Sequence, residues 1–342
     1  MPRRQTMPTE LHGSYAEPLL EVANLRVRFE TPNGTVNAVN GIGYNLAERE
    51  RLVILGESGS GKTVGAEAVM GILPSPPATI SADRLRFEGQ DLLKLSAAKR
   101  RRIRGEQMAM VFQDALTALN PAFTVGDQIA EMYREHRGVS RRLARKRAIE
   151  MLDRVHIPSA ASRVNHYPHQ FSGGMRQRVM IAMALALDPK ILIADEPTTA
   201  LDVTVQAQIL ELLSEIAEES RMALILITHD LGVAAEIADR ILVMYAGRVV
   251  EEGTTRDVFR DAAHPYTMGL MESMPRSDIK RDRLTAIGGS PPNLAKIPAG
   301  CAFHPRCPHV IDRCLVDRPR LESVATGHAA ACHRTEELRR EG

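Results

Sequence analysis

Three short apolar runs along the chain predict strands that are buried on both faces of a sheet. They are "RLVILG" at residues 51–56, "ILIADE" at 191–196 and "ALILITH" at 223–229. Runs of this length, separated by helical patterns, are typical of parallel strands in an α/β core. Active groups in such sheets gather at the carboxyl ends of the strands. The polar residues that end the three runs are therefore expected to meet at one edge.

Two further stretches alternate between apolar and polar residues and predict antiparallel hairpins. The first covers residues 19–50, with "TPNG" between its two halves, and the second covers residues 240–253. Residues 115–170 instead carry helical patterns, such as "RRLARKRAIEMLDRV", and predict an inserted helical subdomain. Beyond about residue 260 the chain is rich in Pro, Gly and His. There "GGSPPNLAKIPAG" (288–300) predicts a loop-rich boundary.

Charge and hydropathy narrow the class of protein. The formal net charge is only +2, so no broad field for nucleic acid or a membrane is expected. The most apolar segments, residues 179–187 and 223–228, are far shorter than the ~20 residues of a membrane span. Residues 1–18 have no apolar run after Arg3 and Arg4 and predict a disordered arm rather than a signal peptide. We therefore expect a cytoplasmic chain that associates with a membrane only through a partner.

The segment "GESGSGKT" fits the phosphate-binding pattern G-x-x-x-x-G-K-[ST]. Its glycines let backbone N–H groups converge on phosphate oxygens, and the following helix N-terminus favours negative charge. Lys62 is predicted to reach the β- and γ-phosphates of a nucleotide, and Thr63 to help hold Mg²⁺. The predicted phosphate loop (P-loop) comprises Gly56, Glu57, Ser58, Gly59, Ser60, Gly61, Lys62 and Thr63.

The run "ILIADE" supplies two adjacent carboxylates at a strand end. Asp195 is predicted to order Mg²⁺. A second carboxylate at the end of a buried strand is costly unless a cation or substrate uses it. We interpret Glu196 as the group that polarises an attacking water. Acidic residues after a strand are also common as helix caps, and the P-loop is what favours the functional interpretation.

The segment "FSGGMRQR" (171–178) places a capping residue and two glycines at the start of a predicted helix. Ser172 can cap a helix that begins near Gly174, which leaves free N–H groups at that N-terminus. From the pattern alone, a simple cap is the better interpretation. However, "SGG-x-Q/R-QR" shortly before a strand that ends in carboxylates closely resembles the signature of ATP-binding-cassette (ABC) ATPases.

Further segments match motifs of this family in the right order, over roughly residues 19–255. Gln113 in "VFQD" matches the Q-loop glutamine, Asp202 in "TTALD" matches the D-loop, and His229 in "ITHD" matches the switch histidine that contacts the γ-phosphate. Phe29 in "VRFE" lies where the family places an aromatic that stacks on adenine. A core-packing role for Phe29 is an equal alternative.

The resemblance implies an α/β fold of the P-loop NTPase class. It comprises a RecA-like parallel-sheet core, an antiparallel β subdomain and an inserted α-helical subdomain at about residues 115–175. Two such cassettes meet head to tail and sandwich two ATPs. Gln113, Glu196 and His229 would then act on the chain's own ATP, with Mg²⁺ held by Thr63, Gln113 and Asp195. The signature residues that would serve the partner's ATP are Ser172, Gly173 and Gly174.

Two segments resemble the oligopeptide/dipeptide importers within this family: "DALTALNPAFTVGDQI" (114–129) and "HPYTMGLM" (264–271). The resemblance implies an ATP-hydrolysing subunit at the cytoplasmic face of the cell membrane. Its partners would be a second ATPase subunit, two membrane permeases and an extracytoplasmic peptide-binding protein. Nickel or another small solute is an alternative cargo. A soluble ABC ATPase acting on nucleic acid or ribosomes is a further alternative, although a solvated helix face explains the basic run "KRRRIRG" (99–105) at least as well.

All four cysteines lie near the C-terminal end, at Cys301, Cys307, Cys314 and Cys332. The expected compartment disfavours disulfides. Four thiolates suit either a structural zinc site or an iron–sulfur cluster. The separations of five, six and seventeen residues contain no C-x₂₋₄-C pair and do not decide between the two.

The string "GC-x-F-x-PRCP…C…P-x-L…H…AC" resembles the C-terminal segment of peptide-importer ATPases, where four cysteines hold a [4Fe–4S] cluster. The resemblance favours a structural [4Fe–4S] cluster over zinc. The expected organisation is an arm at 1–18, an ABC ATPase domain at 19–260 and an extension at 261–342 that holds the cluster. The neighbouring histidines, expected at the surface or behind the ligands, are His304, His309, His328 and His333.

Overall fold

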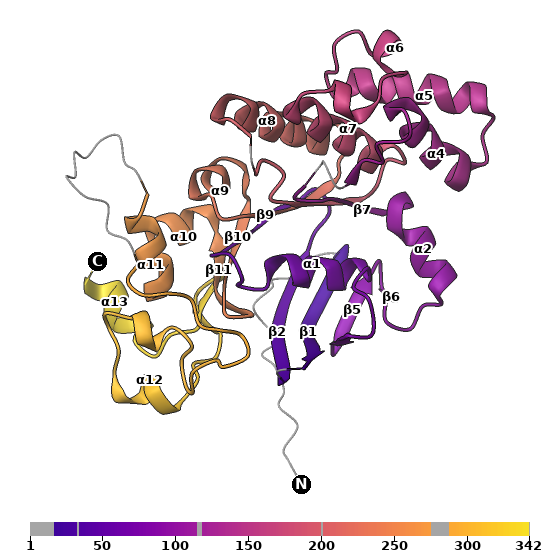
Figure 1. Ribbon diagram of the computed structural model, residues 1–342. Helices are drawn as coiled ribbons and strands as arrows, with labels where there is room; N and C mark the ends of the chain where they lie inside the picture. Colours follow the sequence, from indigo (N-terminus) through magenta and orange to yellow (C-terminus); the bar gives the residue numbers. More distant parts are fainter. Residues whose placement is uncertain (1–16, 33, 115–117, 200, 275–286, 342) are drawn as a thin grey trace.

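The computed structural model describes residues 17–32, 34–114, 118–199, 201–274 and 287–341. Its framework is an eight-stranded sheet of order β12-β13-β11-β10-β3-β9-β8-β7, beside a smaller sheet built on β1 and β2 (Figure 1). Most of the predicted N-terminal arm, residues 1–16, lies outside the described residues. Within the described ranges, no helix is long and apolar enough to cross a membrane.

The strands that the apolar runs predict form the centre of the large sheet. They are β3 (Arg51–Leu55), β8 (Ile191–Asp195) and β9 (Ala223–Thr228). β9 pairs in parallel with both β3 and β8. The outer parallel strands are β7 (Met108–Val111) and β10 (Arg240–Tyr245). The polar ends of the three runs therefore lie at the same edge of the sheet, as predicted.

Both faces of the parallel strands are buried because their side chains are apolar on each side. On β3, Leu52 and Ile54 join the core under the smaller sheet, whereas Val53 and Leu55 join the core under the helices. Each fully buried side chain of this size contributes ~1.5–3 kcal/mol, which holds the strand ends in place. The helices over the second core are α7 (Gly173–Leu185), α8 (Val203–Glu219) and α9 (Leu231–Ile237).

The smaller sheet confirms the hairpin predicted for residues 19–50. Its long strands, which pair antiparallel, are β1 (Leu20–Thr31) and β2 (Gly34–Leu46). Three short strands that the sequence pattern did not predict complete it: β4 (Ala78–Ser81), β5 (Arg84–Phe87) and β6 (Gln90–Asp91). Helix α1 (Lys62–Met70) packs between this sheet and the large one.

The helical pattern predicted for residues 115–170 is confirmed in the described part of this range. Its elements are α4 (Val125–Arg137), α5 (Arg141–Arg154), α6 (Ala160–Arg163) and the 3-10 helix η1 (Pro168–Gln170). Thr124 accepts from the N–H of Asp127 and Ser140 from that of Leu143, and each cap of this kind contributes ~1 kcal/mol. The subdomain lies at the top of Figure 1, across the molecule from the yellow C-terminal segment.

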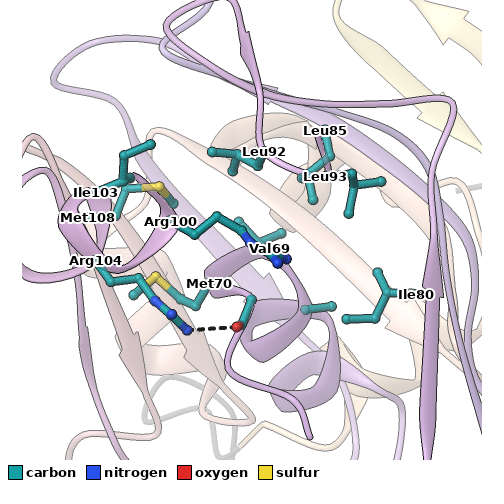
Figure 2. A pocket seen from close by; sticks show the side chains of 12 residues that line it. Val69, Met70, Ile80, Leu85, Leu92, Leu93, Arg100, Ile103, Arg104 and Met108 are labelled. Carbon is teal, nitrogen blue, oxygen red and sulfur yellow. Dashed lines mark hydrogen bonds between the residues drawn. The ribbon is translucent and has the colours of Figure 1, made fainter. Parts of the chain in front are cut away.

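The basic run at residues 99–105 lies on helix α2 (Ala97–Glu106), which contains no buried residue. Arg102 pairs with Glu106 on the same exposed helix. Arg104 donates to the carbonyl oxygen of Gly71 at 2.7 Å, beside a small apolar pocket of about 40 Å³ (Figure 2). The pocket lies at the C-terminal end of α1, away from the end that carries Lys62. The first part of the run is therefore a solvated helix face, with Lys99, Arg101 and Arg102 exposed, whereas Ile103 packs against the core and Arg104 is anchored at Gly71.

The C-terminal segment joins the large sheet rather than lying beside it. The second predicted hairpin is formed by β10 and β11 (Arg248–Thr254), and β13 (His328–Ala330) pairs antiparallel with β11. Residues 288–300 contain no helix or strand, as predicted. The other elements are α10 (Thr255–Arg260), α11 (Pro265–Glu272), η2 (His304–Arg306), α12 (Asp312–Val316), β12 (Glu322–Ala325) and α13 (Thr335–Glu341).

A buried polar cluster fastens β11 to the segment that follows it. The carboxylate of Glu251, fully buried on β11, accepts the N–H groups of Ala263 at 2.7 Å and His264 at 2.9 Å. Its Oε1 also lies 2.8 Å from Nε2 of His328 on β13. His264 accepts the N–H of Tyr266 through Nδ1 and so caps α11. Burial lowers the pKa of His264 to about 4, so this ring is neutral at pH 7.

We expect His264→Asn to reduce the loss of stability at acid pH. The pKa of His264 falls from 6.5 to about 4 on folding, so the folded state binds fewer protons between these values. Stability is therefore lost as the pH falls through this window, by ~2 kcal/mol at pH 5. Asn keeps an acceptor for the Tyr266 N–H but does not titrate. Urea unfolding at pH 7 and pH 5 measures the difference.

The matched control is His156→Asn, at an exposed position where the backbone already has φ 59°. This control should keep the pH dependence of the wild-type protein. An equal acid loss in the His264→Asn variant and the wild type would contradict the assignment.

Candidate nucleotide-binding site

The loop between β3 and α1 carries the predicted phosphate-binding segment and packs against two other strands. Gly61 has φ 97°, and a Cβ there would lie 2.3 Å from the carbonyl oxygen of Ala38 on β2. A Cβ on Gly56 would lie 2.3 Å from the carbonyl oxygen of Met244 on β10. Only glycine fits at both ends, because a side chain would collide with backbone that cannot move aside.

Lys62 begins α1, and it is buried with only 5% of its surface exposed. Its Nζ donates to the carbonyl oxygens of Gly56 at 2.7 Å and Glu57 at 3.0 Å. Burial lowers the pKa of Lys62, and the charges of Glu196 and Asp195 partly offset this. The ammonium is thus held at the loop, where bound phosphate oxygens would compete with the two carbonyls.

Thr63 and Asp195 place two oxygen atoms that could bind a metal ion side by side at the base of the loop. Thr63 Oγ1 donates to Asp195 Oδ1 at 3.1 Å. Burial raises the pKa of Asp195 to about 6, although the hydrogen bond from Thr63 lowers it. Hard oxygen donors of this kind suit Mg²⁺, whose charge would favour the ionised carboxylate.

The remaining ligands in the coordination shell of a magnesium ion would come from outside the protein. Among the described residues, no three His, Cys, Asp or Glu side chains are arranged to hold a metal ion. Mg²⁺ is commonly bound by one or two carboxylates together with substrate phosphates and water. The residues present therefore fit a magnesium ion that arrives with a nucleotide.

Glu196 lies directly after β8 with a left-handed backbone, φ 42°, which costs on the order of 1 kcal/mol for a non-glycine residue. Its N–H donates to the carbonyl oxygen of Ile227 on β9 at 2.9 Å. Both carboxylate oxygens have partners. Oε2 accepts from Gln113 Nε2 at 3.0 Å and from Thr199 Oγ1 at 3.1 Å, and Oε1 lies 3.3 Å from His229 Nδ1.

The structure therefore brings together three predicted site residues from the ends of three neighbouring strands. Gln113 follows β7, Glu196 follows β8 and His229 follows β9. An ionised carboxylate only accepts hydrogen bonds, so Glu196 favours the His229 tautomer with its proton on Nδ1. The side chain of His229 is 64% exposed, and its Nε2 is left as an acceptor. Thr199 was not predicted, because no pattern distinguishes it within "PTTALD".

The predicted signature lies at the start of α7 rather than among these residues. Ser172 is the N-cap, and its hydroxyl accepts the N–H of Met175 at 3.4 Å. Gly174 packs against α8, where an added Cβ would lie 2.4 Å from Val205 Cγ1. Asp202 caps α8 by accepting the N–H of Val205 at 3.0 Å. The structure thus confirms the predicted cap at Ser172, and Gly173 is the first residue of the helix.

Phe29 lies on β1, half-buried against the core between the two sheets. This packing is enough to explain an apolar side chain at this position, without any contact to a nucleotide base. Its role as an adenine-stacking residue stays a prediction.

The four cysteines are free thiols that lie near one another in the C-terminal segment. The N–H of Cys301 donates to the carbonyl oxygen of Cys314 at 2.9 Å. Burial, with a smaller contribution from the other three thiols, raises the pKa of Cys307 to about 11. Burial likewise raises the pKa of Cys332, with Cys301 and Cys314 adding to the effect. Thiols are the donor type that a thiolate-bound centre uses, but the described part of the chain contains no group of three or more Cys, His, Asp or Glu side chains placed to hold a metal ion.

Three of the neighbouring histidines have other partners. His328 contacts Glu251, as described above. Nδ1 of His304 lies 2.9 Å from the carbonyl oxygen of Cys301, and Nε2 of His333 lies 3.0 Å from that of Asp317. These contacts leave the choice between cysteine and histidine ligands a prediction.

Comparison with known proteins decides the family. Residues 39–199 match the family model "ABC transporter", and residues 250–314 match "Oligopeptide/dipeptide transporter, C-terminal region". The dipeptide transport ATP-binding protein DppD of Bacillus subtilis is 52% identical over 92% of this chain and 94% of its own length. The oligopeptide transport ATP-binding protein OppD of Salmonella typhimurium is 50% identical over 94% of this chain and 96% of its own length. The chain belongs to this family of ABC transporter ATP-binding proteins.

Solved structures confirm the fold of this ABC ATPase. A dimeric ATP-binding cassette in a post-hydrolysis state, with ADP and phosphate bound, covers 69% of the chain and 99% of its own length. It has a TM-score of 0.62 and 29% sequence identity. CbiO1 of Clostridium perfringens, part of an ABC transporter complex, gives a TM-score of 0.60 at 30% identity over 71% of this chain and 91% of its own. The predicted P-loop ABC fold is therefore confirmed.

Two contacts to the P-loop of this ABC ATPase come from its C-terminal part and were not predicted. The N–H of Glu57 donates to the hydroxyl of Tyr266 at 2.9 Å, and Arg306 binds the Glu57 carboxylate. Tyr266 belongs to "HPYTMGLM", which the sequence singled out only as a resemblance. No local pattern relates either residue to a loop some two hundred positions earlier.

Proposed function

We propose that this ABC ATPase drives the import of dipeptides or oligopeptides across the cytoplasmic membrane. One observation carries the proposal: the cassette and the peptide-transporter C-terminal region occur in one chain. That chain matches DppD and OppD over nearly their whole lengths, and both proteins are named for peptide transport. Nickel or another small solute is the alternative cargo.

In the proposed site the P-loop binds the phosphates of ATP, and Lys62 exchanges its loop carbonyls for β- and γ-phosphate oxygens. Thr63 and Asp195, together with Gln113, would hold Mg²⁺, which would supply positive charge to offset the charge of the phosphates. Glu196 accepts a hydrogen bond from the attacking water and polarises it. His229 is oriented by Glu196 through Nδ1 and can bond the γ-phosphate through Nε2 when that nitrogen is protonated. The distances that support this arrangement are those between Glu196 and its neighbours.

The proposed site needs a second cassette. Ser172, Gly173 and Gly174 lie at the N-terminus of α7, which offers N–H groups to an anion, and they would serve ATP held by the partner subunit. We propose a heterodimer with a second ATPase subunit, bound to two permeases at the cytoplasmic face of the membrane. A peptide-binding protein outside the membrane would deliver the cargo. ATP binding would favour the closed dimer, and hydrolysis would release it.

Reconstitution tests the transport function. The chain is produced together with a second ATPase subunit and two permeases of a peptide importer from the same source, placed in liposomes, and supplied with a peptide-binding protein and labelled dipeptides and oligopeptides. ATP-dependent accumulation of peptide is expected. Uptake of nickel without peptide uptake would overturn the cargo assignment. ATP hydrolysis stimulated by RNA, in a chain that copurifies with no permease, would favour the soluble alternative.

We also propose that Cys301, Cys307, Cys314 and Cys332 hold a [4Fe–4S] cluster, with zinc as the alternative. The backbone hydrogen bond between Cys301 and Cys314 supports the proposal, as does the effect of neighbouring thiols, after burial, on the pKa of Cys307 and of Cys332. Cluster binding would replace the protons of these thiols, and the positive charge of iron would offset the cost of burying the thiolates. The cluster would then act structurally, tying together the loops around η2 and α12.

Anaerobic purification followed by metal and sulfide analysis tests the cluster. We expect about four iron atoms and four acid-labile sulfides per chain, as a [4Fe–4S] centre requires. Cys307→Ser should lower both together, whereas Ser323→Ala, at an exposed position on β12, should leave them unchanged. Stoichiometric zinc without sulfide would establish the alternative.

A further inference from the structure

The C-terminal segment reaches the P-loop through a forked ion pair between Arg306 and Glu57. Nη1 of Arg306 donates to Oε2 of Glu57 at 2.6 Å, and Nη2 donates to Oε1 at 3.0 Å. The side chain of Arg306 is only 4% exposed and that of Glu57 28%. Two parallel bonds from a planar guanidinium fix orientation as well as distance. This contact therefore fixes the orientation of the Glu57 side chain.

Arg306 is itself held rigidly before it meets the loop. Its Nε donates to the carbonyl oxygen of Gly288 at 2.8 Å. Its guanidinium carbon lies 5.8 Å from the ring centroid of Tyr245 and 6.0 Å from that of Phe303. Tyr245, Phe303 and Tyr266 pack against one another, with centroids 4.7–5.5 Å apart. The guanidinium thus approaches the loop from a packed aromatic cluster, not from a mobile surface.

Glu57 is the P-loop residue that Tyr266 and Arg306 contact, and Glu57 in turn contacts the predicted phosphate-binding residue Lys62. Its N–H donates to the hydroxyl of Tyr266 at 2.9 Å, and its carboxylate is held by Arg306. Its carbonyl oxygen accepts from Nζ of Lys62 at 3.0 Å. Any rotation of Glu57 would therefore move the carbonyl against which Lys62 is docked.

The position of Arg306 depends in turn on the cysteine segment. Arg306 ends η2, and Cys307 follows it directly. The turn is closed by the N–H of His304 donating to the carbonyl oxygen of Cys301 at 3.1 Å, and by that of Cys307 donating to the carbonyl oxygen of His304 at 3.3 Å. Two of the four thiols therefore bracket the turn that presents the guanidinium.

We propose that Arg306 is a positioning residue for the nucleotide site: by clamping Glu57 it sets the P-loop geometry, and ATP affinity therefore depends on the folded state of the cysteine segment. The inference rests on the proposed use of the P-loop for ATP. It assigns to the C-terminal segment a part in nucleotide binding, acting through a residue that does not itself touch the nucleotide.

Titration of the full-length chain with a fluorescent ATP analogue in Mg²⁺ tests the proposal. Arg306→Met, which keeps the bulk but loses both bonds, should weaken binding by ~10-fold. Arg306→Lys keeps the charge without the fork and should give an intermediate loss. The matched control is Arg313→Met in the same segment, where the exposed Arg313–Asp317 pair lies away from the loop, and its affinity should equal that of the wild type.

A double-mutant cycle separates positioning from a general structural effect. If Arg306 acts through Glu57, Glu57→Gln alone should weaken binding by a similar factor, and adding Arg306→Met should change it by less than about twofold. Equal, multiplicative losses in the two backgrounds would overturn the proposal, as would wild-type affinity in a folded Arg306→Met variant. Should that variant fail to fold, Glu57→Gln and Arg306→Lys still decide the matter. A wild-type chain that binds no ATP would instead refute the proposed function.

Discussion

Glu196→Gln should abolish ATP hydrolysis in the assembled transporter while leaving ATP binding nearly intact. The amide has the shape of the carboxylate but cannot accept a proton at neutral pH, and general-base catalysis of this type contributes about 10²–10⁴-fold. Lys62, Thr63 and Asp195 are unchanged, so affinity should stay within a few-fold. Steady-state turnover at saturating ATP, together with binding of a fluorescent ATP analogue, measures the two effects separately.

The control for this substitution is Glu236→Gln, which makes the same chemical change at an exposed position on α9. It should keep wild-type turnover. Loss of ATP binding in the Glu196→Gln variant would assign Glu196 to nucleotide binding or to the fold. Undiminished turnover would show that the hydrolysing half-site belongs to the second subunit.

Glu251→Ala should produce the largest loss of stability among single substitutions in the C-terminal half. It removes the acceptor for two backbone N–H groups, at Ala263 and His264, and for the ring of His328. Leaving buried donors without a partner, and one partner of a buried pair alone, costs about 3–5 kcal/mol. Urea unfolding should show a lower midpoint.

Hydrogen exchange can locate this loss. The N–H of Ala331 donates to the carbonyl oxygen of Val250 at 2.8 Å, and it should lose protection when β13 separates from β11. Glu322→Ala, at an exposed position on the neighbouring strand β12, is the control and should change neither measurement by more than ~0.5 kcal/mol. Unaltered protection at Ala331 in the Glu251→Ala variant would mean that this cluster does not hold the two strands together.

The parts of the structure that the sequence predicts are those with a local physical signal. In Arg51–Leu55 the four residues after Arg51 are apolar on both faces of the strand, and such runs separated by helical patterns are typical of parallel strands covered on both sides. The P-loop is recognised from one short stretch, because its glycines and lysine lie within eight consecutive residues, although the backbone that requires Gly56 and Gly61 belongs to the distant strands β10 and β2. For the same reason the cap at Ser172 is predictable.

The parts that the sequence does not predict depend on pairs of residues far apart in the chain. Glu251 and His328 are separated by 77 positions, and Glu57 and Arg306 by 249. Each residue alone is compatible with an ordinary surface position, and only the fold shows that it is buried with a partner. The short strands β4, β5 and β6 were missed for a related reason: two to four residues carry too little alternation to indicate a strand.

The pairing of β13 with β11 also limits where the chain can be truncated and which segments can be exchanged between relatives. A fragment that ended at residue 260 would retain every motif of the cassette and would nonetheless expose the edge of β11. The β11 residues that pair with β13 are Glu251 and Glu252, and an unpaired edge strand is a template for aggregation. Chimaeras that exchange C-terminal segments between relatives should therefore carry β11 and β13 from the same parent. The large sheet should therefore be exchanged as one unit, and the cysteine segment should be exchanged together with it.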